Sequence, residues 1–106
     1  MSEKVKTILA QLRRRFERLY GDRLVRIILF GSQARGDSED GSDIDVLVVL
    51  AGPVAPCEEI SRTIDDVADL SLQNDVVIAC VFMDEDRFLH RNGPLLRNVR
   101  KEGVSI

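Results

Sequence analysis

The hydrophobic positions along the chain form two patterns, one with a helical repeat and one made of short continuous apolar runs. Apolar residues spaced three or four apart are typical of helices that bury one face. The predicted helices cover residues 5–20, 57–72, 84–92 and 94–102. Apolar runs bounded by Gly, Pro or Asp are typical of strands buried in a sheet. The predicted strands cover residues 24–30, 43–50 and 75–83.

Between the first two strands lies a polar, glycine-rich stretch, residues 31–42, which predicts a loop with at most one helical turn after Gly31. Only 12 residues separate these strands, which is near the lower limit for a parallel crossover. The order of elements therefore predicts an α/β (α+β) fold, a small mixed sheet flanked by helices. The length of 106 residues predicts a single domain over residues 1–106.

Composition and charge narrow the classes of function. A net charge of −3, a pI of about 5.1 and no Trp argue against direct nucleic-acid binding. Arg13, Arg14 and Arg15 form a basic run, which we interpret as a solvated helix face, with a local basic patch as the alternative. The apolar runs are too short to span a membrane and the N-terminus is polar, so we expect no membrane segment and a cytoplasmic location.

Candidate phosphate-binding residues follow the first strand. Gly31 permits a sharp turn and lets a ligand approach the backbone closely. Ser32 offers an N–H and a hydroxyl, and it would begin a short helix whose N-terminus favours anions. Arg35 lies three residues further on, near the same helix face, where a guanidinium could bind a phosphate through two hydrogen bonds.

Three carboxylates are candidates for holding a metal. Asp43 and Asp45 are separated by one residue at the start of a strand, so both side chains point to the same face. Their mutual repulsion favours a cation between them, and Mg²⁺ accepts one or two carboxylates together with phosphate oxygens. Asp75 opens the third predicted strand in the same way and would join them if the two strands are neighbours. Such a group suits in-line phosphoryl transfer.

Residues 30–50, FGSQARGDSEDGSDIDVLVVL, carry Gly-Ser, ten further residues and then Asp-x-Asp. This stretch resembles the signature of the polymerase-beta-like nucleotidyltransferase superfamily. Within it, the chain is similar to the small stand-alone group called minimal nucleotidyltransferases. The resemblance covers nearly the whole chain, and the C-terminal GPLLRNVRKEGVSI also looks like the tail of such proteins.

The resemblance implies a polymerase-beta-like nucleotidyltransferase fold and a role for each residue of the motif. Gly31 and Ser32 would bind the triphosphate. Asp43 and Asp45 would bind Mg²⁺, and Asp75 would be the third carboxylate and the general base. Arg35 and Ser42 would make accessory contacts, either to the phosphates or within the loop.

The resemblance also implies a Mg²⁺-dependent enzyme that moves a nucleoside monophosphate, AMP from ATP, to an acceptor. The expected acceptor is a small helical toxin of the HEPN type, so the chain would be an antitoxin that works in a homo- or hetero-oligomer. The alternative is a nucleotide-binding antitoxin or regulatory module that neutralises its partner by contact alone. Transfer to a small molecule such as an aminoglycoside is disfavoured, because enzymes of that kind carry an added helical domain.

Overall fold

The computed structural model describes residues 2–36 and 43–106, and its strands form one mixed sheet in the order β3-β2-β1-β4. The strands are β1 (Leu24–Phe30), β2 (Ile44–Leu50), β3 (Ile78–Asp84) and β4 (Val104–Ser105). Strand β1 is antiparallel to β2 and to β4, whereas β2 and β3 run parallel. The prediction of a small mixed sheet flanked by helices is therefore confirmed.

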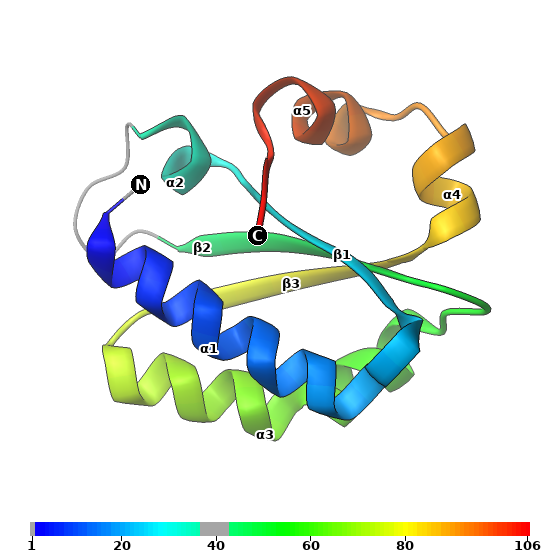
Figure 1. Ribbon diagram of the computed structural model, residues 1–106. Coiled ribbons are helices and arrows are strands. Elements are labelled where there is room, and N and C mark those ends of the chain that lie inside the picture. The colour runs from blue at the N-terminus through cyan, green and yellow to red at the C-terminus, as the bar shows by residue number, and fades with distance from the viewer. Residues whose placement is uncertain (1, 37–42) are drawn as a thin grey trace.

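Helices cover both faces of this sheet (Figure 1). The helical segments are α1 (Glu3–Tyr20), the 3-10 turn η1 (Gly21–Arg23), α2 (Ser32–Arg35), α3 (Pro56–Asn74), α4 (Glu85–His90) and α5 (Pro94–Glu102). Helices α1 and α3 lie side by side under one face, and α4 and α5 lie over the other. The single helical turn expected after Gly31 is α2.

Strand β2 is central, and its alternating side chains contribute to two cores. Val46 and Val48 pack in the core between the sheet and helices α1 and α3, whereas Leu47 and Val49 pack with Leu96 of α5 on the other face. All four of these β2 side chains are fully buried. A strand covered on both faces needs apolar residues at every position, which explains the continuous apolar run.

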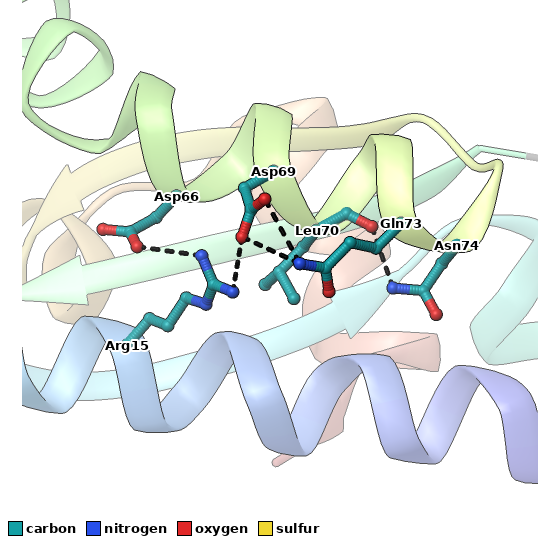
Figure 2. Close-up of polar contacts among 6 residues, drawn as sticks. All are labelled: Arg15, Asp66, Asp69, Leu70, Gln73 and Asn74. Carbon is teal, nitrogen blue, oxygen red and sulfur yellow. Dashed lines mark hydrogen bonds and ion pairs between the residues drawn. The ribbon is translucent and has the colours of Figure 1, made fainter.

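Charged side chains also join α1 to α3 on the surface of the protein. Figure 2 shows Arg15 of α1 reaching between Asp66 and Asp69 of α3, with N–O distances of 3.1 and 2.7 Å. Arg13 pairs with Glu17 at 3.4 Å. Two arginines of the basic run are therefore compensated by acids. Arg14 is exposed, whereas Arg13 and Arg15 are half-buried, so the run is only in part the solvated helix face that was expected.

Two features differ from the sequence-based expectations. Strand β3 begins at Ile78, not at residue 75, because Asp75 ends α3 in the left-handed conformation with φ 51° and ψ 50°. Strand β4 was not expected, since two residues carry too little pattern to indicate a strand. Within the described residues, no helix has the length and apolar character needed to cross a membrane.

Candidate functional site

The site forms where β1 ends beside the start of β2. Phe30, the last residue of β1, is in antiparallel register with Asp45, so Gly31 lies against the Asp45 side chain. A Cβ at Gly31 would come within 2.6 Å of Asp45 Oδ2. Gly31 has φ 78° and ψ −159°, a region that only glycine occupies readily. The Gly-Ser turn and the acidic strand end are therefore one structural unit.

Asp45 is the second residue of β2, and Asp43 immediately precedes this strand. Side chains alternate along a strand, so Asp45 shares the face of Leu47, which packs in that core. Asp45 is half-buried and Asp43 is exposed. Burial raises the pKa of Asp45 above its usual range, and the nearby charge of Asp43 raises this pKa further. Ionised together, the two carboxylates repel each other, and a cation between them would relieve that repulsion.

Helix α2 follows directly from Gly31. The backbone N–H groups of Ala34 and Arg35 both donate to the Gly31 carbonyl at 3.1 Å, and Gly36 ends the turn with φ 77°. Ser32 is thus the first residue of the turn and directly follows the glycine that contacts Asp45. The structure therefore brings Gly31 and Asp45 together, with Ser32 adjacent to Gly31 along the chain.

Arg35 lies at the end of this turn and pairs with a residue that the sequence did not single out. Its Nη1 is 3.1 Å from Oε1 of Glu102, at the end of α5. The signal that could have found Glu102 is its place in the C-terminal tail that resembles minimal nucleotidyltransferases. Ser42, the other accessory residue predicted, lies outside the described residues.

Asp75 occupies a different setting from the one expected. It is exposed at the end of α3, three residues before β3 begins. In the parallel register, Asp45 lies beside Ala79, and Val77 accepts a hydrogen bond from the Ile44 N–H at 2.8 Å. Among the described residues, no three His, Cys, Asp or Glu side chains form a group that could hold a metal. The structure therefore does not gather Asp75 with Asp43 and Asp45.

The residues at this strand end fit a hard divalent cation shared with a polyphosphate. Mg²⁺ commonly uses one or two carboxylates and completes its octahedron with water and phosphate oxygens. Asp43 and Asp45 supply two neighbouring carboxylates, and burial, with a further contribution from the charge of Asp43, raises the pKa of Asp45. Because Gly31 has no Cβ, the Asp45 carboxylate lies directly against the backbone of the turn.

The fold is a mixed sheet in which a Gly-Ser turn packs against the Asp-x-Asp end of a strand. Comparison with known proteins identifies the family that has this arrangement. The family described as "Nucleotidyltransferase domain" matches residues 9–103. The chain therefore belongs to the nucleotidyltransferase domain family.

Known proteins similar to this chain have related descriptions. A Methanocaldococcus jannaschii protein named "Putative protein adenylyltransferase" is 41% identical over 85 residues, 79% of each chain. A chain in the crystal structure of a toxin–antitoxin with AMP-PNP superposes with a TM-score of 0.63 and 21% identity, covering 98% of this chain and 72% of that chain. A chain of the toxin–antitoxin MntA–HepT gives a TM-score of 0.55 and 20% identity, covering 96% and 68%. The two structural likenesses support the fold alone.

Proposed function

We propose that this protein is a Mg²⁺-dependent nucleotidyltransferase that moves AMP from ATP to a toxin protein of the HEPN type, and so acts as an antitoxin. The observation that carries the proposal is the contact between Gly31 and the Asp45 carboxylate, with the charge of Asp43 nearby. That contact puts a close-approach backbone turn and a pair of repelling acids at one point. A metal-bound triphosphate satisfies both features at once.

The proposed reaction joins an acceptor hydroxyl oxygen to the α-phosphorus of ATP. The bond from this phosphorus to the oxygen that bridges to the β-phosphorus breaks, and pyrophosphate leaves. Bound Mg²⁺ supplies compensation for the negative charge of the phosphates. Asp43 and Asp45 would hold the metal, Gly31 and Ser32 would bind phosphate oxygens, and Arg35 and Ser42 would make accessory contacts. The acceptor hydroxyl would also have to lose its proton to a base. The sequence predicts Asp75 for this role, and the structure does not gather Asp75 with Asp43 and Asp45.

A partner protein supplies the acceptor in this proposal. A similar protein is named as an adenylyltransferase of proteins, and similar solved structures are toxin–antitoxin assemblies. These descriptions support a protein acceptor and a toxin as that protein, and the resemblance to minimal nucleotidyltransferases supports the HEPN type. A cytoplasmic location and a single domain over the whole chain are part of the same proposal.

The decisive experiment combines the purified protein, Mg²⁺ and its toxin partner with ATP that is radiolabelled at the α-phosphate. We expect label on the partner, and none when the ATP is labelled at the γ-phosphate, since only AMP is transferred. The matched control is Asp45→Asn, which keeps the shape of the side chain but removes a metal ligand. We expect it to lower transfer at least about 100-fold. Equal labelling by this variant would show that the metal site is misassigned.

A second candidate function is neutralisation of the partner by contact, with nucleotide bound but not transferred. The observation that favours it is the exposed position of Asp75 on the α3 cap, apart from any three-carboxylate group among the described residues. Asp75→Asn distinguishes the candidates when toxin neutralisation in cells is measured. Full neutralisation by this variant, together with absence of label on the partner, supports contact alone, whereas loss of neutralisation supports catalysis through Asp75.

A further inference from the structure

An ion pair connects the turn after the Gly-Ser motif to the opposite end of the chain. Arg35 Nη1 lies 3.1 Å from Glu102 Oε1, with side-chain exposures of 46% for Arg35 and 21% for Glu102. Arg35 is the last residue of α2, and Glu102 is the last residue of α5. Two short helices on the candidate site's side of the sheet are therefore linked through their C-terminal residues.

The residues that follow Glu102 in the chain fix the position of its backbone. The Gly103 N–H donates to the Val99 carbonyl at 2.8 Å, and a Cβ at Gly103 would come within 2.7 Å of Ile28 Cγ2. Immediately after it, Val104 pairs with Leu29 of β1. Glu102 is thus anchored on β1, the same strand whose end leads into Gly31. One short strand fixes the position of Glu102 relative to the candidate site.

We propose that Glu102 is a positioning residue, which holds the Arg35 guanidinium in place for the triphosphate. This inference rests on the proposed function, because it needs ATP to bind at Gly31 and Asp45. A long arginine side chain loses rotational freedom when it binds phosphate, and a preformed contact removes part of that cost. The guanidinium has five N–H donors, so a contact through Nη1 is compatible with phosphate binding by the same group.

The opposite role would be competition, in which the Glu102 carboxylate occupies Arg35 and must be displaced by ATP. The two roles predict opposite signs for the same variant. Under positioning, Glu102→Gln weakens ATP binding, because the guanidinium is no longer held. Under competition, Glu102→Gln strengthens ATP binding, because a negative charge that attracts Arg35 is removed.

Calorimetric titration of the full chain with Mg²⁺ and ATP tests the proposal. We expect Glu102→Gln to weaken binding by about twofold to tenfold, in line with one ordered side chain. Glu102→Asp retains a carboxylate and should restore most of the affinity. Glu58→Gln is the matched control, since it removes the same charge from an exposed residue of α3 on the other face of the sheet. We expect this control to bind ATP as the wild type does.

A double-mutant cycle with Arg35→Ala separates positioning from a general structural effect. If Glu102 acts through Arg35, then Glu102→Gln has no further effect once Arg35 is replaced. An equal loss of affinity in that background, or tighter binding by Glu102→Gln alone, overturns the inference. Unchanged binding by Glu102→Gln, with the wild type binding ATP, overturns the inference but leaves the proposed function intact. A wild type that binds no ATP overturns both.

Discussion

At Gly31 the backbone and the neighbouring side chain both require a residue without a Cβ. The combination of φ 78° and ψ −159° is nearly exclusive to glycine, and the space that a Cβ would take is occupied by the Asp45 carboxylate. The motif glycine therefore has two separable functions in the structure. It permits the turn into α2, and it lets Asp45 remain beside that turn.

Substitution of Gly31 tests these two functions separately. Gly31→Ala should lower the free energy of unfolding by about 1–3 kcal/mol through backbone strain alone. It should also weaken Mg²⁺ binding, because the methyl group displaces Asp45. Gly36→Ala is the matched control, since Gly36 also has a positive φ of 77° but, among the described residues other than its chain neighbours, no atom lies within 4 Å of its Cβ position. Denaturant unfolding and magnesium titration measure both effects, and an equal loss of Mg²⁺ affinity in the two variants would contradict the assignment.

The pKa of Asp45 leads to a prediction about stability and metal. Because burial and Asp43 raise this pKa, the folded state favours the protonated carboxyl. The contribution of Asp45 to stability is therefore present at acidic pH and is lost as the pH rises through the raised pKa, so the ionised form destabilises the fold near neutral pH.

We expect Asp45→Asn to melt at a higher temperature than the wild type near neutral pH in EDTA. The difference should shrink as the pH falls and Asp45 takes up its proton. Added Mg²⁺ should stabilise the wild type but not the variant, because ligand binding to the folded state raises its stability. Thermal melts over a pH series with and without Mg²⁺ measure this. A variant that melts below the wild type in EDTA would contradict the destabilisation by the ionised Asp45 carboxylate.

At the scale of elements, α1 and α3 are held together by a buried contact as well as the surface pairs of Arg15. The Tyr20 hydroxyl donates to Glu59 Oε1 at 3.0 Å, and the whole Glu59 residue is only 3% exposed. Arg62 Nη1 lies 3.5 Å from the same carboxylate oxygen. A buried carboxylate needs such partners, so this cluster fixes the end of α1 against the start of α3.

Glu59→Ala should lower the free energy of unfolding by about 1–3 kcal/mol, because the buried Tyr20 hydroxyl loses its acceptor. Glu59→Gln keeps an oxygen that can accept this hydrogen bond and should cost less. Arg15→Ala, which removes partly exposed ion pairs with Asp66 and Asp69, should cost less than about 1 kcal/mol. Urea unfolding of the three variants gives the order. If Arg15→Ala proves the most damaging, the surface pairs outweigh the buried contact.

Elements with strong periodicity were predictable from the sequence, and weak elements were not. The strand over 24–30 has the bounds of β1, and the helix over 5–20 differs from α1 by two residues at its start. Asp75 was misplaced because Val76, Val77 and Ile78 continue an apolar run, although the strand starts only at Ile78. An Asp tolerates the left-handed conformation, so the helix cap and the strand onset look alike in sequence.

The candidate site shows the same division between local and long-range features. The sequence placed Gly31 and the Asp-x-Asp pair at the ends of two strands with strong apolar patterns. Their contact depends on the antiparallel pairing of β1 with β2, which the sequence did not specify. The pair of Arg35 with Glu102 joins residues far apart in the chain and depends on α5 and β4 returning to β1. No local pattern contains that information, because it arises only when the sheet is assembled.

At the scale of the whole molecule, charge sets a condition on nucleotide binding. The chain carries a net charge of −3, and two of its acids lie at the candidate site. A free triphosphate is itself strongly negative, so both the overall field and the local carboxylates repel it. Arg35 is a cation near the turn, and its pairing with Glu102 offsets part of its charge. A divalent cation between the carboxylates and the phosphates would reverse the sign of this interaction.

ATP should therefore bind in the presence of Mg²⁺ and lose most of its affinity in EDTA. Raising the ionic strength in EDTA should recover part of the binding, because salt screens repulsion between like charges. In the presence of Mg²⁺, Asp43→Asn should bind ATP as weakly as the wild type does in EDTA, because one of the two metal ligands is lost. Titration of a fluorescent ATP analogue under these conditions measures each effect. Equal affinity with Mg²⁺ and with EDTA would mean that ATP binds through the backbone and Arg35 alone, and Asp43 and Asp45 would then need another role.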